Sequence, residues 1–386
     1  MKSGKPKILI CTGIFPPEIG GPASYALSLA GHLAGQGQVT VLTYSRSWSW
    51  AEDAKLSFRV VRIWLGWPKV LRHLIYLFRA SWLARGCDTV LALNAISAGI
   101  PARLVVGKAR FVVRIVGDAA WEKAINTGAT SLLLNDFQSS KRSGLIARMH
   151  GWQLKTCERA DAIIVPSEYL AGIVAGWGVP REKIHVVYNA VDFKPSPLSK
   201  EEARKKLGIS GNIILTVGRL VPWKGFQMLI KIIPKLSEIN QFFKLVIVGD
   251  GPDRNKLGSV IKNLNLERKV VMVGRKSQTD LADYMAAADM AVLNTGYEGF
   301  SHLILEFMSA GVPVITTNAG GNLEVIHQGE NGLMVKYNDE FNLIEAVRAI
   351  WNNSELRDKF IAAGRETVGE LTVDNMFEQT LKVILP

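Results

Sequence analysis

The sequence predicts an α/β protein made of two doubly wound domains. A chain of 386 residues exceeds what one hydrophobic core usually organises. Its first 44 residues follow the order strand, glycine-rich loop, helix and strand, which is the opening βαβ unit of a parallel sheet. A second series of alternating strands and helices follows a stretch rich in proline and turn-forming residues at 189–197.

Short apolar runs in both halves are the expected strands. In the first half these are residues 7–12, 39–44, 59–64, 89–93, 111–116, 162–165 and 183–188, and in the second half 213–217, 245–248, 270–273, 290–294 and 314–316. Residues 22–35 have apolar side chains at helical spacing, and Ser167-Glu168 begins a short helix. We therefore expect domains at 1–193 and 194–369, followed by an amphipathic segment at 370–386.

The composition limits the cellular setting. With 48% hydrophobic residues, both domains should be well packed. No apolar stretch approaches the roughly 20 residues that are needed to span a bilayer. The three cysteines, Cys11, Cys87 and Cys157, are few and lack metal-binding spacing. We expect a cytoplasmic protein, with a possible peripheral position at the inner face of the membrane.

Positive charge is concentrated in the first half of the chain. Residues 1–193 hold 23 Lys and Arg against 12 Asp and Glu, whereas the remainder holds 23 against 22. This asymmetry indicates an anionic partner for the first domain. Residues 58–85 form the densest basic and aromatic stretch, and residues 71–79 within it have helical spacing. They could form a membrane-surface helix, or an ordinary helix with aromatic residues in the core and solvated arginines.

One run near the C-terminal end is more informative than any other. Residues 297–315 place Glu298 and Glu306 eight positions apart, around a loop that opens a helix. Gly299 leaves backbone N–H groups uncovered at the helix start, a place that attracts phosphate and other anions. Glu306 lies in an apolar run, where an unpaired carboxylate is costly. On chemistry alone, ligand binding and a structural salt bridge both remain open.

Four motifs occur in order along nearly the whole chain. They are Phe15-Pro16-Pro17-Glu18-Ile19-Gly20-Gly21-Pro22-Ala23, Val217-Gly218-Arg219-Leu220-Val221-Pro222-Trp223-Lys224-Gly225, Val248-Gly249-Asp250-Gly251-Pro252 and the run from Tyr297 to Ile315. Together they resemble the glycine-rich loop, G-R-x(3–4)-K-G, G-x-G-P and E-x7-E motifs of retaining glycosyltransferases of family 4 (glycosyl transferases group 1). The resemblance implies the GT-B fold, in which two Rossmann-like domains face across a cleft and the last helix commonly crosses back to the first domain.

The resemblance also implies roles for individual residues. Arg219 and Lys224 would bind the diphosphate of a nucleotide-sugar donor, although a lone pair of such charges on a loop is more often simply solvated. Glu298 would contact the donor sugar, and Glu306 would accept hydrogen bonds from the ribose hydroxyls. Backbone groups would complete the donor site, at Gly20 and Gly21 in the first domain, at Gly274 and Arg275 beside the base, and at Gly299, Phe300 and Ser301 beside the sugar and phosphates.

One region departs from the family pattern. Family members often have a histidine after a strand of the first domain, whereas residues 114–122 contain none. Asp118 could take a binding or base role there, or it could cap the following helix. The chain also lacks an obvious D-x-D pair after a strand of the first domain, so we expect no metal and no other cofactor.

The expected function is transfer of a hexose from a UDP- or GDP-sugar to a hydroxyl group, with retention of anomeric configuration. The basic first domain suggests a lipid-linked or otherwise anionic acceptor, as in polysaccharide, lipopolysaccharide or glycolipid assembly. The alternatives are a sucrose- or trehalose-type synthase acting on a soluble sugar or sugar phosphate and, more distantly, a non-enzymatic nucleic-acid-binding protein. The last is suggested by a pI near 9.5 and interleaved tryptophans, but we expect no nucleic-acid partner.

Overall fold

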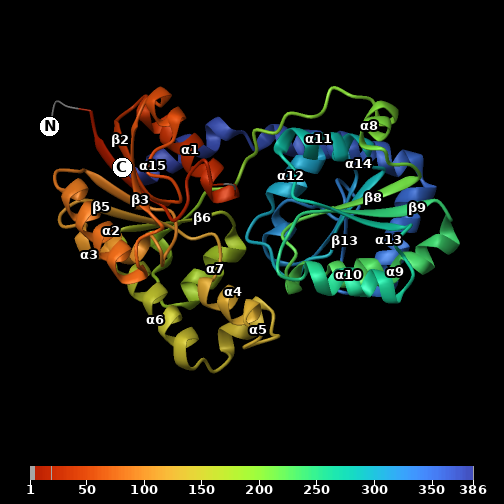
Figure 1. Cartoon of the computed structure of the whole chain (residues 1–386), viewed down its shortest axis with the longest axis horizontal. Helices are drawn as coiled ribbons and strands as arrows, with labels where there is room; N and C mark the ends of the chain where they lie inside the picture. The colour runs from red at the N-terminus through yellow and green to blue at the C-terminus, as the bar shows by residue number, and fades with distance from the viewer. Residues whose placement is uncertain (1–4, 19, 386) are drawn as a thin grey trace. The chain divides into compact units, whose positions relative to one another are not determined.

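A computed structural model describes residues 5–18 and 20–385 of the chain, which form two compact units (Figure 1). Among the described residues, the first unit combines 5–124, 138–187 and 374–385, and the second combines 125–137 and 188–373. Apart from the segment 125–137, the chain stays in the first unit up to residue 187, where the sequence places the boundary at 193. It returns at residue 374, where the sequence places the last segment from 370.

The first unit contains a seven-stranded parallel sheet in the order β3-β2-β1-β4-β5-β6-β7. Its strands are β1 (Lys7–Cys11), β2 (Gln38–Ser45), β3 (Arg59–Trp64), β4 (Thr89–Ala92), β5 (Arg110–Arg114), β6 (Ala162–Val165) and β7 (Ile184–Val186). The helices between the strands along the chain are α1 (Gly21–Ala34), α2 (Lys69–Ala84), α3 (Gly99–Val105), α4 (Ala119–Asn126), α5 (Leu134–Ser139), α6 (Gly144–Arg159) and α7 (Glu168–Gly176), with short 3-10 turns η1 (Ala51–Lys55) and η2 (Arg181–Lys183). Most of α5 and the end of α4 lie in 125–137, the segment that groups with the second unit.

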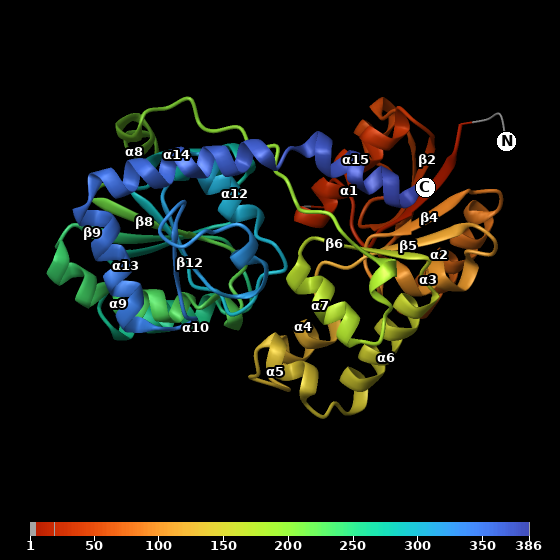
Figure 2. The ribbon, with the colours of Figure 1, turned by 180° about the vertical axis from the view of Figure 1, so that it is seen from behind.

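Helices cover both faces of this sheet. One core is built from the inner sides of α2, α3, α6 and α7 packed on the strands, and it includes the fully buried Tyr76 of α2. The ribbon seen from behind shows α1 and α15 (Val373–Ile384) on the other face (Figure 2). Helix α15 is tied there by the Thr89 hydroxyl, which donates to the Ile384 carbonyl at 3.0 Å, and by Arg110 Nε, which donates to the Val383 carbonyl at 3.1 Å. The end of the chain therefore belongs structurally to the first unit.

The second unit contains a six-stranded parallel sheet in the order β10-β9-β8-β11-β12-β13. Its strands are β8 (Asn212–Val217), β9 (Phe243–Val248), β10 (Val270–Gly274), β11 (Met290–Leu293), β12 (Val314–Thr317) and β13 (Leu333–Val335). Its helices are α8 (Lys200–Leu207), α9 (Phe226–Ile239), α10 (Arg254–Asn263), α11 (Gln278–Ala287), α12 (His302–Ser309), α13 (Glu340–Asn352) and α14 (Ser354–Glu370), with 3-10 turns η3 (Pro222–Lys224) and η4 (Gly320–Glu324).

This second sheet is also covered on both faces. Helices α9, α10 and α13 pack on one side, whereas α8, α11, α12 and α14 lie on the other (Figures 1 and 2). The order of each sheet reverses beside its first strand, as in doubly wound folds, and ligands of such sheets bind beyond the carboxyl ends of the strands. The predicted α/β class with two doubly wound units is confirmed.

Within the described residues, no helix is both long enough and apolar enough to cross a bilayer.

Candidate functional site

The candidate site of the second unit begins where β8 and β9 end. A Cβ atom on Gly249 would lie only 1.9 Å from the carbonyl oxygen of Gly218. Both glycines have positive φ angles, 141° and 154°, which other residues rarely adopt. Because no side chain fits between them, the two loops are fixed against each other directly before Arg219.

Arg219 and Arg275 share one pocket at this edge. Together with Asp250 and Gly251 they line a volume of about 350 Å³. Arg275 follows β10, whose last residue, Gly274, accepts a hydrogen bond from the Gly249 N–H at 2.9 Å. The structure thus brings together two segments that the sequence assigns to donor binding. Two arginines lining one pocket suit a phosphate-bearing ligand.

Lys224 ends η3 and forms an ion pair with Glu298. The two residues are 74 positions apart in the chain, and their side chains are only 18% and 16% exposed. Gly225, which follows Lys224, has a φ of 58° and lies so close to Asn294 that a Cβ would meet the Asn294 carbonyl oxygen at 2.3 Å. The turn after β8 is therefore locked against the loop after β11, and this contact joins the Lys224 and Glu298 motifs.

Gly321 holds the loop that contains Glu298. Its N–H donates to the Glu298 carbonyl at 3.0 Å, and a Cβ at this position would lie 2.2 Å from the Gly299 carbonyl oxygen. Gly321 was not among the site residues predicted from the sequence. The available signal is that Gly320-Gly321 follows a strand, just as Gly20-Gly21 follows the first strand.

Phe300 and Ser301 lead into α12 with side chains that are 5% and 3% exposed. Ser301 is the N-cap residue of α12, and its side chain makes no cap hydrogen bond. The Phe300 carbonyl accepts a hydrogen bond from Asn189 Nδ2 at 3.2 Å. The predicted segment 299–301 therefore contributes backbone at the start of α12, since its two larger side chains are buried in the core.

Glu306 lies in the second turn of α12, on the same helix that Ser301 caps. Burial raises the pKa of its carboxyl group to about 7, because the charged form loses hydration there. At neutral pH this acid therefore exists in both protonation states. A ligand that donates hydrogen bonds to the carboxylate would favour the charged form.

In the first unit, Gly20 and Gly21 stand at the start of α1, after β1. The Gly20 carbonyl accepts hydrogen bonds from the N–H groups of Ala23 at 2.9 Å and Ser24 at 3.2 Å. A Cβ on Gly21 would meet nothing within 4 Å. Packing among the described residues therefore does not require a glycine at position 21.

Asp118 is a helix cap in the structure. Its side chain is fully buried, and Oδ1 accepts hydrogen bonds from the N–H groups of Ala120 at 2.9 Å and Trp121 at 3.1 Å, at the start of α4. Oδ2 accepts a bond from Gln138 Nε2 at 3.0 Å. Of the two roles that the sequence leaves open, these contacts favour capping, because both carboxylate oxygens already bind protein donors.

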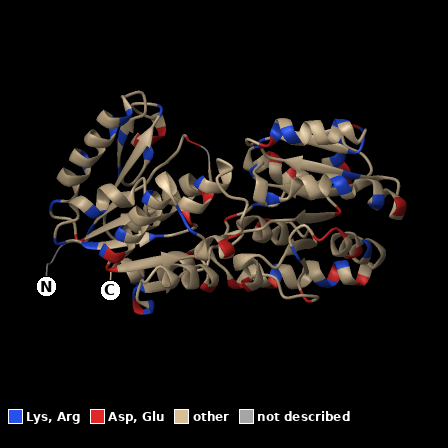
Figure 3. Ribbon diagram, turned by 90° about the horizontal axis from the view of Figure 1, so that it is seen from below, with Lys and Arg blue, Asp and Glu red and all other residues tan. Residues whose placement is uncertain are grey.

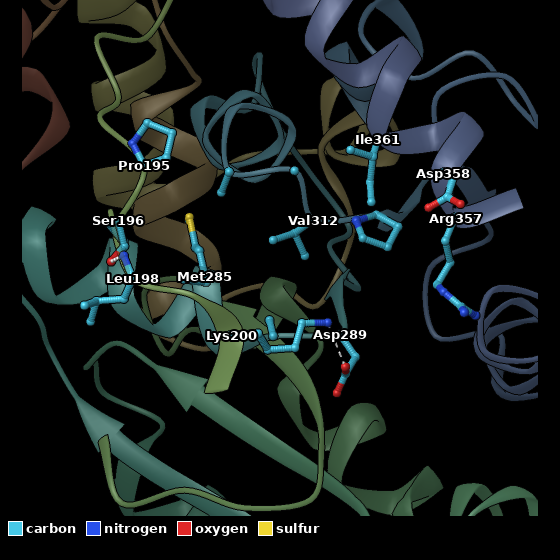
Figure 4. Close-up of a pocket in the computed structure, with 16 residues that line it drawn as sticks. Pro195, Ser196, Leu198, Lys200, Met285, Asp289, Val312, Arg357, Asp358 and Ile361 are labelled. Atoms are coloured by element: carbon cyan, nitrogen blue, oxygen red, sulfur yellow. Dashed lines mark hydrogen bonds and ion pairs between the residues drawn. The ribbon is translucent and has the colours of Figure 1, made fainter. Parts of the chain in front are cut away.

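A second pocket of the second unit lies at the amino ends of its strands. Figure 4 shows its lining, which includes Asp289 before β11 and Ile361 of α14, around a volume of about 350 Å³. Asp289 pairs there with Lys200 at 3.0 Å and with Arg204 at 2.6 Å. The carboxylate is thus already neutralised within the protein, and this pocket is separate from the edge that holds Arg219.

Among residues 5–18 and 20–385, no group of three or more His, Cys, Asp or Glu side chains is placed to hold a metal ion.

Comparison with known proteins gives two family matches. The model described as "Glycosyltransferase Family 4" matches residues 19–194, and the model described as "Glycosyl transferases group 1" matches residues 199–367. The two matches follow each other along the chain and contain all four motifs apart from the first residues of the N-terminal one.

Individual proteins of this kind are also similar to this chain. An uncharacterized glycosyltransferase of Methanocaldococcus jannaschii is 29% identical over 238 residues, which cover 60% of this chain and 61% of that protein. A GDP-mannose-dependent alpha-(1-6)-phosphatidylinositol monomannoside mannosyltransferase of Mycobacterium tuberculosis is 26% identical over 386 residues, covering 94% of this chain and 93% of that one. Among solved structures, an Anabaena protein in complex with UDP and glucose has a TM-score of 0.79 at 19% identity, with 97% of this chain and 98% of that chain covered.

The structural likeness supports the fold, and the two consecutive family matches support the enzyme class. The chain belongs to the GT-B glycosyltransferases of family 4, the glycosyl transferases group 1.

Proposed function

We propose that this glycosyltransferase moves a hexose from a UDP- or GDP-sugar to a hydroxyl group, with retention of anomeric configuration. The observation that carries the proposal is the cluster at the carboxyl edge of the second sheet. Arg219 and Arg275 share one pocket there, and Lys224 pairs with the first glutamate of the E-x7-E run. A nucleoside diphosphate offers anionic oxygens to such cations and ribose hydroxyls to a buried carboxylate.

The cations act on the leaving group. As the bond between the anomeric carbon and the phosphate oxygen breaks, negative charge grows on the diphosphate, and fixed positive charges stabilise that state more than the ground state. Arg219 would grip two phosphate oxygens, and Lys224 would supply a compact charge. The ion pair with Glu298 fixes the position of the Lys224 ammonium group.

The two glutamates have separate roles in this proposal. Glu298 orients the donor sugar, and Glu306 accepts hydrogen bonds from the ribose hydroxyls. Retention then proceeds on one face of the sugar: the acceptor oxygen bonds to the anomeric carbon on the side that the phosphate leaves, and the hydroxyl proton passes to a departing phosphate oxygen. Glu298 has no nucleophilic role in this scheme.

No metal ion and no other cofactor is required in this scheme. The charge of the diphosphate is met by arginine, lysine and the start of α12, which replace the divalent ion that other glycosyltransferases use. Transfer should therefore continue in the presence of EDTA.

The acceptor is proposed to be lipid-linked or otherwise anionic, in polysaccharide, lipopolysaccharide or glycolipid assembly. Two observations favour it: the excess of basic residues in the first 193 positions, and the similarity over nearly full length to the phosphatidylinositol monomannoside mannosyltransferase. We place the protein in the cytoplasm, which agrees with three free cysteines in the described structure.

A ligand-shift experiment tests the donor site. UDP and GDP are each added to the purified protein with and without EDTA, and the melting temperature is followed. At least one nucleotide should raise it, EDTA should leave the shift intact, and Arg219→Ala or Lys224→Ala should abolish it. Arg268→Ala, which removes an exposed arginine elsewhere in the second unit, is the matched control. If neither nucleotide raises the melting temperature of the wild type, the donor assignment fails.

Transfer assays then separate the acceptor classes. A panel of nucleotide sugars is offered with a lipid-linked diphosphate sugar, a glycolipid, and soluble sugars and sugar phosphates. Product formation only with soluble acceptors would favour the synthase alternative. NMR of the new linkage shows whether the anomeric configuration is retained, and an inverted product would refute the one-face mechanism.

A further inference from the structure

Helix α2 of the first unit exposes a row of large apolar side chains. Val70 is 73% exposed, Leu74 57%, Phe78 71% and Trp82 52%. The four positions are spaced by four residues, so they lie along one side of the helix. We call these four residues the apolar row.

The row is not needed to hold α2 in place. The helix already packs on the sheet through Tyr76 and Ala80, which are fully buried, and through Ala84, which is 5% exposed. This arrangement bears on the two alternatives that the sequence leaves open. Tyr76 lies in the core, but Phe78 and Trp82 do not, so an ordinary helix with all its aromatic residues inside is excluded.

Positive charge surrounds the apolar row. No acidic residue occurs between Asp53 and Asp88, whereas seven Lys and Arg do. Lys69, Arg79 and Arg85 are exposed, and the guanidinium carbon of the exposed Arg59 lies 6.0 Å from the ring centroid of Trp82. Arg62 does not contribute to this surface, because its side chain is buried and its Nε lies 2.7 Å from Asp53 Oδ2. Figure 3 marks the basic and acidic positions along the ribbon.

Tryptophans extend the surface at the start of the helix. Trp67 directly precedes Pro68, the N-cap residue of α2, and it packs against Trp48 and Trp64 with ring centroids 6.1 Å apart in both pairs. Trp48 is 62% exposed. Tryptophan is the residue that proteins place at the boundary between lipid and water.

We propose that α2 and the Trp48–Trp64–Trp67 cluster dock on the surface of an anionic phospholipid bilayer. The helix would lie in the plane of the interface, with the apolar row inserted and the basic residues at the level of the lipid phosphates. A second copy of the chain fits less well, since it would bring the same predominantly basic surface against itself. A nucleic acid would match the charge but would leave the apolar row exposed to water.

Docking is tested by co-sedimentation of the full chain with vesicles, in the absence of any donor. Vesicles of phosphatidylcholine with 30–50% phosphatidylglycerol, roughly the charge of an anionic membrane, are compared with pure phosphatidylcholine at low and high salt. We expect binding to the anionic vesicles that weakens with salt, and little binding to the neutral ones.

Two pairs of variants locate the surface. Phe78→Ser should weaken vesicle binding by about tenfold, whereas Phe341→Ser, which removes a 70% exposed phenylalanine of the second unit, should not. Arg79→Glu should weaken it by at least about fivefold, whereas Arg268→Glu, at an exposed position of the second unit, should have little effect. All four variants should keep the nucleotide-induced shift in melting temperature, which separates this proposal from the donor assignment.

Failure to bind anionic vesicles overturns the proposal, as does binding that Phe78→Ser and Arg79→Glu leave unchanged. Sedimentation velocity tests whether the apolar row is instead an interface between copies of this chain. If the protein is an oligomer that Phe78→Ser dissociates, the apolar row is an interface between copies of this chain and the bilayer is the wrong partner.

Discussion

Replacing Glu306 with glutamine should make the ligand-free protein more stable at alkaline pH and, at the same time, a weaker binder of nucleotide. The carboxyl group is buried, and its pKa rises from an ordinary value of 4.5 to about 7. Below pH 4.5 the group is neutral in both the folded and the unfolded chain, so it costs no stability. As the pH rises towards 7 the unfolded chain ionises first, and stability falls until the folded form ionises as well.

The size of the effect follows from the difference between these two pKa values. A pKa of about 7 against 4.5 corresponds to about 3 kcal/mol of unfolding free energy, which is lost in full once the pH exceeds 7. Glutamine has nearly the same shape and is never charged, so Glu306→Gln avoids this loss. The variant should be more stable than the wild type by up to about 3 kcal/mol at pH 8 and by less than about 1 kcal/mol at pH 5.

The assay is urea unfolding of nucleotide-free protein at pH 5 and pH 8, followed by intrinsic fluorescence. Glu330→Gln removes an exposed glutamate of the same unit and controls for the general loss of one negative charge. In parallel, Glu306→Gln should weaken UDP or GDP binding by about tenfold, because hydrogen bonds to a charged acceptor are stronger than those to a neutral amide.

Two results would refute this reasoning. Equal stability changes at pH 5 and pH 8 would mean that Glu306 is not held in a desolvated site. Unchanged nucleotide affinity would mean that the carboxylate does not receive the ribose hydroxyls, even if the stability effect appears as expected.

Three other predictions concern the loops and the chemistry. Gly321→Ala places a Cβ 2.2 Å from the Gly299 carbonyl oxygen, so the loop must shift. As a result, kcat/KM for transfer should fall at least about tenfold. Gly369→Ala is the control, because a Cβ there meets nothing within 4 Å, and it should leave kcat/KM unchanged. Asp118→Asn should leave transfer activity within about threefold of the wild type, because asparagine caps a helix as well as aspartate does. A loss of activity above a hundredfold would instead indicate that Asp118 acts as a base. Transfer should proceed at the same rate with excess EDTA, and a rate that falls and is recovered by a divalent ion would contradict the metal-free scheme.

The fold could be predicted because its signals are local. Each strand that the sequence analysis placed in the second half corresponds to an observed strand, from β8 to β12, since buried parallel strands are continuous apolar runs. Strand β13 was missed because its apolar run stops after three residues, Leu333–Val335, between Gly332 and Lys336, whereas the equally short β7 lies in the longer predicted run 183–188. A run so short has no periodicity that separates it from a loop.

The parts of the site that were missed or left open depend on contacts between distant positions. The contacts that favour capping by Asp118 include Gln138, twenty residues later, whose side-chain amide donates to the second carboxylate oxygen. The need for glycine at position 321 comes from the backbone of Gly299. Neither contact can be derived from the local sequence, although the pair Gly320-Gly321 after a strand marks the position, whereas Arg219, Glu298 and Glu306 lie in motifs of short, fixed spacing.

The candidate donor site of the second unit contains buried charged groups that reduce the stability of the fold. A carboxyl group is buried at Glu306 without enough hydration to stay charged at neutral pH, and Lys224 and Glu298 are withdrawn from water as a pair. These features occur together at the carboxyl edge of the sheet, beside glycines with positive φ. A packed hydrophobic edge would be more stable, so selection for stability alone does not account for them. A ligand that brings phosphate charge to Lys224 and hydroxyl donors to Glu306 would offset the desolvation cost at both places. The buried charges of Lys224, Glu298 and Glu306 are therefore the strongest physical argument for where the nucleotide sugar binds.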